Sequence, residues 1–366
     1  MMYHFCSLLG FFKGLKQKKN STFRQSSALP EDICRQFSLA EIKAATNNFH
    51  PDSVIGAGRF WTTYRGTIDD GTMVAVKHCQ SRSLDEVRDF RNEVQMLCQL
   101  RHPHLVSLIG ICLEQNEMLI VLEYMSRRSL ANFFNRNLDY VPLAWKHRLR
   151  ICIGAARGLH YLHTGAKHAV IHRAITSLNI LLDDEYSCKL SDFGLSKMGP
   201  PSMSKSFKKV ESRIVGTYGY MAPEYAMHGE LTEKSDVFSF GVILFEVLFG
   251  VRVNEWTSPT FKQNILDQAI DPYLKGRIAP ECFKKYLEIA CSCVHKEGNE
   301  RPAMGEVEVT LELALELQEK ADSELEGLDP HGECMYGELS FCGSVTNLVF
   351  GGYPSETDSN NSDENS

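Results

Sequence analysis

The stretch VIHRAITSLNILLDDEYSCKLSDFG, residues 170–194, decides how the rest of the chain is interpreted. Apolar runs in it alternate with His172, Arg173 and Asn179, and CKLS is typical of a strand that leads into Asp-Phe-Gly at Asp192. An Asp-Phe-Gly tripeptide means little alone, so the flanking sequence must supply the context.

Short β-rich runs punctuated by glycine dominate the first third of the chain. The runs SVIGAG, TTYRGTI and MVAVKHC predict three antiparallel strands, with a turn at Asp69–Gly71 between the last two. Residues 85–100 predict a helix because apolar residues recur there at helical spacing, and LVSLIGIC and MLIVLEY predict two further strands. In front of these elements, FSLAEIKAATNNF predicts a short helix with Ser38 as its N-cap. Together they predict a small lobe of sheet and helix.

After Ser129 the apolar periodicity is mainly helical. RLRICIGAARGLHYLH predicts an amphipathic helix, and 281–294 and 304–319 predict two more. SDVFSFGVILFEVLFG is apolar on nearly every side, which predicts a helix buried in the centre of a second lobe. The predicted fold class is therefore α+β, with two lobes.

The composition of the 366 residues, 43% of them hydrophobic, allows one large domain or two lobes with tails. The net charge is −7, which argues against nucleic acid as a partner. Residues 321–366 contain ten acidic residues and no Lys or Arg. With the low-complexity end YPSETDSNNSDENS, this predicts that 321–366 form an acidic, disordered tail.

The twelve cysteines are scattered without the spacing of a disulfide framework. Several lie in apolar runs, so we expect buried, reduced thiols and a cytosolic location. The sequence shows no Cys and His cluster with metal-ligand spacing.

The N-terminal residues 1–36 have two interpretations. No apolar run approaches the roughly 20 residues of a membrane-spanning helix, and the lysines follow the apolar run 5–12, unlike a secretory signal. One interpretation is a flexible leader. The other is a membrane-surface anchor with Cys6 acylated and the lysines facing anionic lipid at the inner face of the plasma membrane. Met2 in place of glycine excludes myristoylation.

With these elements placed, the motifs resemble those of a eukaryotic protein kinase. ATNNF, RHPHLVSLIG, IGAARGLHYLHTGA and LTEKSDVFSFGVILFEVL resemble plant receptor-like and cytoplasmic kinases, in particular the Pto-type and the FERONIA-like malectin receptor kinases. The resemblance covers about residues 37–319. It implies the bilobal kinase fold, with a juxtamembrane-like helix and N-lobe at 37–125 and a mainly helical C-lobe at 126–320.

The resemblance also assigns the ligand-binding residues. Lys77 in VAVK matches the lysine that binds the α- and β-phosphates, and Glu93 matches its helix partner. Asn179 and Asp192 match the ligands of Mg²⁺. The complete set of positions matching ATP contacts is Ile55, Gly56, Gly58, Ala75, Lys77, Glu93, Glu123 and Met125.

A further set of matches is structural: His172, Glu224, Asp236 and Arg301. Glu224 and Arg301 match residues that form an ion pair in the family. Asp236 matches the aspartate that holds the backbone of the catalytic loop. None of them is assigned a catalytic role.

Three departures from the family pattern fall on the phosphate-transfer machinery. Ala174 stands where the catalytic aspartate, which follows Arg173, is expected, and Thr176 stands where active members have a lysine that steadies the transferred phosphate. Trp61 stands at the third glycine of the phosphate-covering loop. A positioned acid–base group contributes roughly 10²–10⁴-fold in rate, so Ala174 predicts severe impairment.

The selective pattern predicts a pseudokinase that still binds ATP and Mg²⁺. It would act as a scaffold or allosteric partner of an active receptor-like kinase or another signalling protein. Nucleic acid is not expected as a partner. One alternative is a weakly active serine/threonine kinase. Another is an interaction module independent of nucleotide, in which Trp61 blocks the pocket.

Hydroxyl residues lie among basic residues in the segment that follows Asp-Phe-Gly. A phosphate on one of them could pair with Arg173 and order the segment. A solvated loop rich in Ser and Lys is the alternative. The candidate phosphosites are Ser204, Ser206, Ser212 and Thr217.

Overall fold

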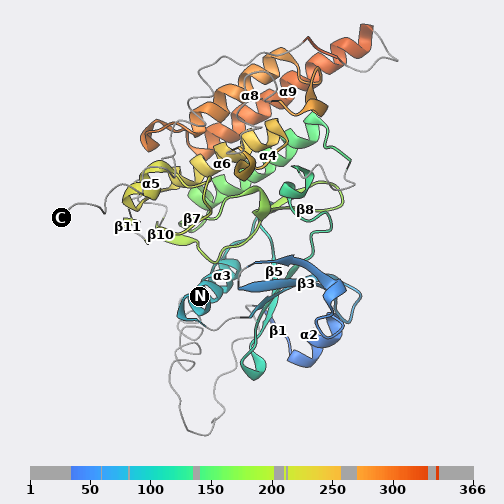
Figure 1. Cartoon of the computed structure of the whole chain (residues 1–366), viewed down its shortest axis with the longest axis vertical. Helices are drawn as coiled ribbons and strands as arrows, with labels where there is room; N and C mark the ends of the chain where they lie inside the picture. The colour runs from blue at the N-terminus through green and yellow to red at the C-terminus, as the bar shows by residue number, and fades with distance from the viewer. Residues whose placement is uncertain are drawn as a thin grey trace, which may run out of the picture. The chain divides into compact units, whose positions relative to one another are not determined.

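The computed structural model describes residues 34–58, 60–80, 83–134, 141–201, 210–211, 213–256, 270–328 and 335–337 (Figure 1). The chain divides into two compact units. One contains the residues up to Gln99 together with Ser107–Tyr124, and the other contains Leu100–Val106 and the residues from Met125 onward.

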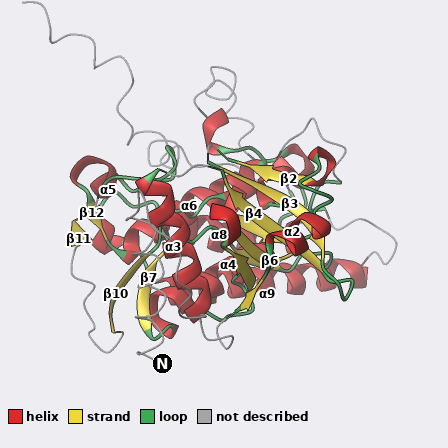
Figure 2. Ribbon diagram, turned by 90° about the horizontal axis from the view of Figure 1, so that it is seen from below, coloured by secondary structure: helices red, strands yellow, loops and turns green. Residues whose placement is uncertain are grey.

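A six-stranded sheet forms the first unit, in the order β1-β5-β6-β4-β3-β2. All neighbouring pairs are antiparallel except β1 with β5, and Figure 2 shows β2, β3, β4 and β6 side by side. Gly71, with φ +83°, allows the predicted tight turn between β3 and β4. The strands are β1 (Arg35–Gln36), β2 (Val54–Ala57), β3 (Trp61–Thr67), β4 (Met73–Cys79), β5 (Leu108–Cys112) and β6 (Met118–Glu123).

Two helices complete the described part of the first unit. The predicted short helix is α2 (Leu39–Ala45), and Ser38 is its N-cap, as predicted, in a capping box with Glu41. Leu39 and Ile42 are buried in a core cluster with residues of β3, β4 and β6. The second helix, α3 (Leu84–Gln99), begins and ends one residue before the predicted bounds, and its apolar face includes the buried Phe90, Val94 and Leu97.

The second unit is mainly helical and is built around α6 (Glu233–Phe249). Every residue of α6 from Ser235 to Phe249 is buried, which confirms the predicted central helix. Around it, α8 packs on α6, and α9 packs on both α4 and α8. The other helices in the described residues of this unit are α4 (Trp145–His160), α5 (Pro223–His228), α8 (Pro280–Cys293) and α9 (Met304–Leu328).

Three two-stranded sheets carry the loops of the second unit. They pair β7 (His168–Ile171) with β10 (Lys197–Pro201), β8 (Ile180–Leu182) with β9 (Cys188–Leu190), and β11 (Val210–Glu211) with β12 (Glu230–Leu231). The predicted strand before Asp-Phe-Gly is β9. The mixed sheet-rich and helix-rich units confirm the predicted α+β kinase-type fold.

The predicted start of the acidic tail at residue 321 is wrong for its first eight residues, because α9 continues to Leu328. Asp322 lies in the helix and forms an ion pair of 2.8 Å with Lys146 of α4. Its Oδ1 also accepts hydrogen bonds from Gln318 Nε2 and from the hydroxyl of Tyr336, each 2.8 Å. Burial alone would raise the pKa of Asp322, but these partners outweigh it and lower the pKa. The rest of the tail lies outside the described residues, except for 335–337.

Across the described ranges, no helix is both long and apolar enough to span a membrane. The nine cysteines in those ranges are reduced thiols. Burial raises the pKa of the Cys152 thiol to about 12, so this thiol is unreactive. Residues 1–33, including Cys6, lie outside the described part, so the two interpretations of the N-terminus stay predictions.

Candidate active site

Lys77 and Glu93 form the polar centre of the first unit. Lys77 on β4 directs its Nζ to Oε2 of Glu93 on α3, at 2.7 Å. Only 13% of the lysine side chain and 3% of the glutamate side chain are exposed. Charges this deeply buried are tolerated because they are paired, so loss of either one leaves the other without compensation.

The predicted glycine loop joins β2 to β3. Ile55 and Gly56 lie on β2, and the amide of Gly58 donates to the carbonyl of Trp61 at 2.8 Å, which closes the turn. Ala75 lies on β4, two residues before Lys77, and is buried. Residues two apart on a strand share one face of the sheet, so Ala75 and Lys77 lie on the same face.

Trp61 occupies the space beside this loop. Its ring centroid lies 4.9 Å from Lys77 Nζ, within the range of a cation–π contact. A methyl group placed on Gly58 would lie 2.7 Å from Cε2 of the same indole, so the ring also packs directly on the loop backbone. Trp61, at the third glycine position, therefore contacts both of the predicted phosphate-binding groups, the Lys77 ammonium and the backbone of the glycine loop.

Glu123 and Met125, the predicted adenine contacts, lie at the end of β6 and just beyond it. Glu123 is fixed by Ser107: its carboxylate accepts from the Ser107 amide at 2.6 Å, and its own amide donates to the Ser107 carbonyl at 3.1 Å. Met125 is buried, and it is the first residue after the break between the units.

In the second unit, Asp236 organises the loop after β7. Its carboxylate accepts hydrogen bonds from the amides of His172 (2.7 Å) and Arg173 (2.8 Å) and contacts Nε2 of His163 at 3.0 Å. Asp236 itself is 1% exposed. Arg173 has φ +69°, a backbone conformation that is costly for a side-chain-bearing residue. The two hydrogen bonds that the Asp236 carboxylate accepts from these amides stabilise that conformation.

His172 is fully buried, with its ring 4.8 Å from that of Phe193. Burial lowers its pKa, so the imidazole is neutral. Its Nδ1 lies 3.3 Å from the Ala174 amide and accepts from it, which assigns the ring proton to Nε2. His172 therefore supports the loop backbone through its ring nitrogen.

The loop around Ala174 is well ordered by hydrogen bonds. The Asn179 side-chain amide donates to the Ala174 carbonyl at 2.8 Å, and the Asn179 backbone amide donates to the carbonyl of Thr176 at 3.0 Å. Ala174 and Thr176 are buried, at 7% and 3% exposure. Methyl and hydroxyl groups thus occupy positions where acid–base and cationic chemistry are expected, within an otherwise intact loop.

Asn179 and Asp192 offer oxygen donors that fit Mg²⁺. Because the Asn179 amide nitrogen is engaged by Ala174, its Oδ1 is left as the acceptor. Asp192 follows β9 and has φ +68°, and the residue before it is tied to Asn179 by the Ser191 amide, at 2.9 Å from the Asn179 carbonyl. The two predicted metal ligands therefore belong to one hydrogen-bonded structure.

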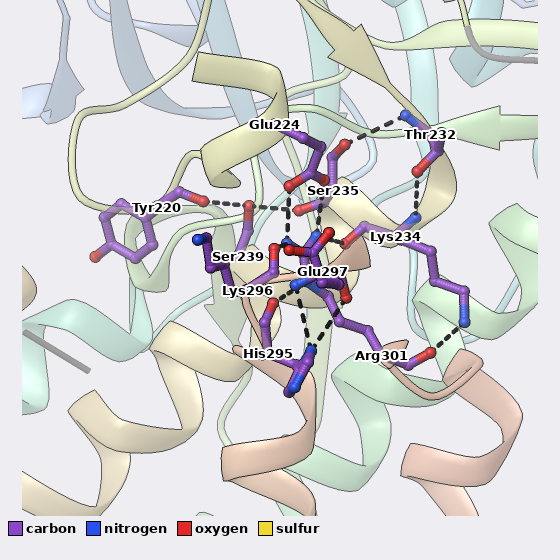
Figure 3. Close-up of polar contacts among 10 residues, drawn as sticks. All are labelled: Tyr220, Glu224, Thr232, Lys234, Ser235, Ser239, His295, Lys296, Glu297 and Arg301. Carbon is purple, nitrogen blue, oxygen red and sulfur yellow. Dashed lines mark hydrogen bonds and ion pairs between the residues drawn. The ribbon is translucent and has the colours of Figure 1, made fainter. Parts of the chain in front are cut away.

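Glu224 and Arg301 form a two-pronged ion pair (Figure 3), with Nη1–Oε1 and Nη2–Oε2 both 2.8 Å. The Arg301 side chain is completely buried. Its remaining donors reach the carbonyls of Lys234, His295 and Lys296. One side chain therefore joins the start of α5, the start of α6 and the segment before α9.

Arg173 reaches the segment that follows Asp-Phe-Gly. Its guanidinium donates to the carbonyls of Leu195 (2.9 Å) and Arg213 (3.0 Å) and to the hydroxyl of Tyr225 (2.6 Å). Thr217 is exposed, whereas Ser204, Ser206 and Ser212 lie outside the described residues.

A buried polar contact between α6 and this segment was not predicted from the sequence. The Tyr220 hydroxyl donates to Glu246 Oε1 at 2.6 Å, and the same oxygen accepts from the Val253 amide at 2.7 Å. Glu246 is 0% exposed, and burial raises its pKa to about 7. The available signal was an acidic residue inside the apolar run FSFGVILFEVLF.

Glu246 predicts an unusual pH dependence of stability. Because its folded pKa is raised from 4.5 to about 7, the folded state holds the proton more tightly, and stability falls as pH rises between these values. Relative to Glu246→Gln, wild type should lose about 2 kcal/mol of unfolding free energy between roughly pH 5.5 and 8.5. Urea unfolding of both proteins across this range measures the difference.

Tyr220→Phe is the companion variant for this measurement. The Tyr220 hydrogen bond lowers the pKa of Glu246, so its removal should raise the folded pKa further. The loss of stability should then begin at the same pH as in wild type but continue to higher pH and become larger. Parallel stability curves for wild type and Glu246→Gln would show that Glu246 does not titrate in this range.

This combination of elements and residues defines a class of protein. A sheet-rich unit presents a buried lysine–glutamate pair, and a helical unit holds an ordered loop with a following Asp-Phe-Gly. Residues 49–311 match the family described as protein tyrosine and serine/threonine kinase. The chain belongs to this protein kinase family.

Within the family, the similar proteins are plant receptor-like kinases, as predicted. The chain is 49% identical over 324 residues to the receptor-like protein kinase FERONIA of Arabidopsis thaliana, which covers 85% of this chain and 36% of that protein. The receptor-like protein kinase ANXUR2 of the same plant is 43% identical over 360 residues, covering 95% of this chain and 42% of its own length. The chain thus spans less than half the length of these relatives.

Proposed function

We propose that this chain is a pseudokinase that binds ATP and Mg²⁺ and acts as a scaffold or allosteric partner of an active receptor kinase. The observation that carries the proposal is Ala174: a buried methyl group in a loop whose other hydrogen bonds are in place. A loop without its base can retain its shape and its binding functions while losing the reaction.

The residues that would bind the nucleotide and metal are largely retained. Lys77, held by Glu93, would offset phosphate charge, and Asn179 and Asp192 would bind Mg²⁺ through oxygen. When bound, ATP would supply the phosphoryl group, and the metal would neutralise its charge. Nothing at position 174 can accept the proton of an acceptor hydroxyl.

A weakly active serine/threonine kinase is the second candidate. It is favoured by the order of the loop and by the names of the relatives, which are kinases. Phosphoryl transfer depends mostly on positioning and electrostatic stabilisation, so slow transfer can survive without the base. A nucleotide-independent interaction module is the third candidate, and the contact of Trp61 with Lys77 favours it.

We also place the chain in the cytoplasm, at the inner face of the plasma membrane. The support is the naming of its relatives as receptor-like kinases, together with the apolar and lysine-rich N-terminal sequence. Phosphorylation of Thr217 by an upstream kinase is part of the same proposal, since its side chain is exposed. Whether the partner is a receptor kinase can be tested by co-purification.

Two measurements on the purified chain test the proposal. Saturating MgATP should raise Tm by several degrees, because a ligand at a hundred times Kd stabilises the folded state by about 2.7 kcal/mol. Phosphate incorporation from labelled ATP should not exceed that of Lys77→Met. Ala75→Leu, which places bulk on the predicted adenine side, should reduce the Tm shift.

Each possible result selects one candidate. No Tm shift at millimolar MgATP removes ATP binding from the proposal and favours the interaction module. Wild-type incorporation clearly above Lys77→Met makes the chain an active kinase.

A further inference from the structure

The strand register directs Trp61 toward Lys77. In the pairing of β3 with β4, Thr63 is opposite Lys77, so the two side chains share one face of the sheet. Trp61 lies two residues before Thr63 and points to the same face, one diagonal step from the lysine. The 4.9 Å separation between the ring centroid and Lys77 Nζ follows from this register.

The indole fills the space between the lysine and the glycine loop. It lies on the backbone of Gly58, where a methyl group would meet Cε2 at 2.7 Å and Nε1 at 2.9 Å. It also reaches Gly56, whose added methyl group would lie 3.8 Å from Cζ3. Backbone amides of a glycine loop and a lysine ammonium are the groups that bind nucleotide phosphates. The ring of Trp61 therefore competes with a polyphosphate for both.

The effect is confined to one end of the site. Trp61 is opposite Cys79, whereas Ala75, on the predicted adenine side, is four residues before Cys79 on β4. At about 3.3 Å per residue, these positions are roughly 13 Å apart. A single indole at the level of Cys79 therefore obstructs phosphate without obstructing the base.

We propose that Trp61 determines the ligand specificity of this site, which takes adenosine and its phosphates through the nucleoside part and gains little from the polyphosphate. The inference rests on the proposed nucleotide binding and specifies its ligand class. The ammonium of Lys77 is occupied by Glu93 on one side and by the indole on another, so a phosphate must displace the ring to reach it.

Calorimetric titration of adenosine, ADP and ATP, each with Mg²⁺, tests the inference. Wild type should bind ATP and adenosine with Kd values within roughly threefold of each other. In Trp61→Gly, ATP should bind about tenfold or more tightly relative to adenosine, because charge-assisted hydrogen bonds to phosphate become available. Trp61→Ala carries the same expectation if the glycine variant does not fold.

Phe60→Gly is the matched control. Phe60 is the neighbouring loop residue, 40% exposed, and its replacement loosens the loop without removing the ring from Lys77. Its ratio of ATP to adenosine affinity should equal that of wild type. If Phe60→Gly changes the ratio as much as Trp61→Gly does, loop flexibility is the cause and the inference is overturned.

The remaining outcomes separate this inference from the proposed function. Wild-type binding of ATP more than about thirtyfold tighter than adenosine, equivalent to roughly 2 kcal/mol, keeps nucleotide binding and overturns the role of Trp61. Binding of ATP by Trp61→Gly alone would show that Trp61 obstructs the site, but it would overturn the inferred ligand class and remove ATP binding from the natural chain. Absence of binding in all variants rejects both.

Discussion

Replacing Ala174 by aspartate is expected to raise phosphotransfer by about 10²–10⁴-fold over wild type, the range contributed by a positioned acid–base group. The surrounding loop supports this expectation. Asp236 accepts hydrogen bonds from the amides of His172 and Arg173, and the Asn179 side chain donates to the carbonyl of residue 174. A carboxylate introduced at 174 would therefore be attached to a backbone that is already fixed.

The test is incorporation of labelled phosphate by purified Ala174→Asp, with Ala174→Asn as the isosteric control that lacks a base. Lys77→Met combined with Ala174→Asp should be inactive, which excludes a contaminating kinase. Adding Thr176→Lys to Ala174→Asp should raise the rate further, since lysine restores a charge near the transferred phosphate.

Some outcomes would assign the defect elsewhere. If Ala174→Asp remains silent and Ala174→Asp with Trp61→Gly is active, the obstructed phosphate loop is the dominant defect. If Ala174→Asn incorporates phosphate as fast as Ala174→Asp, the new side chain acts by its shape, and the missing base is not the cause of the defect.

Elements with strong periodicity were predictable from the sequence, because their pattern and their burial have the same cause. The apolar run around Phe240 predicted a central helix, and α6 is buried from Ser235 onward. Ser38 predicted a helix start, because its hydroxyl and Glu41 satisfy free backbone amides locally. In contrast, β1 has two exposed residues, and only its parallel pairing with Gly110 and Ile111 of β5 makes it a strand.

Contacts between distant segments account for what the sequence did not predict. The count of acidic residues after 320 suggested a solvated tail, but Asp322 has Lys146 as its partner, 176 positions earlier in the chain. Sequence motifs identified Lys77 as a phosphate-binding residue and Trp61 as a departure from the glycine loop. Their contact depends on the register between β3 and β4, which neither local pattern contains.

The individual site residues were accessible through motifs, whereas their chemistry depends on burial. Glu246 was not singled out, because an acidic residue in an apolar helix shows its raised pKa only when its surroundings are known. Likewise, the neutral state and tautomer of His172 follow from its burial and from the amide of Ala174.

Removing Arg301 is expected to cause a large loss of stability in this fold. Arg301→Met should lower the unfolding free energy by about 3–5 kcal/mol, the usual cost of breaking a buried ion pair by deleting one partner. Glu224 would lose both of its charge-assisted bonds, and three backbone carbonyls would lose a donor. Urea unfolding measures the loss.

An exposed pair supplies the control for this prediction. Arg150 and Glu319 also pair arginine with glutamate between two helices, at 2.7 Å, but their side chains are 53% and 46% exposed. Arg150→Met should therefore cost less than about 1 kcal/mol. Similar losses in Arg301→Met and Arg150→Met would show that burial does not set the strength of the first pair.

Arg301→Met can also distinguish an effect on global stability from an effect on local order in the segment around the start of α5. Glu224 lies beside Tyr225, whose hydroxyl accepts from Arg173 at 2.6 Å and donates to the carbonyl of Arg213 at 2.9 Å. If the pair with Arg301 holds this arrangement, amide hydrogen exchange in residues 213–228 should increase in Arg301→Met under conditions where the protein is still folded. Arg301→Lys should give an intermediate increase, because lysine keeps the charge but cannot form the two-pronged contact. Unchanged exchange in this segment would limit the pair to global stability and leave Arg173 and Tyr225 to order the segment by themselves.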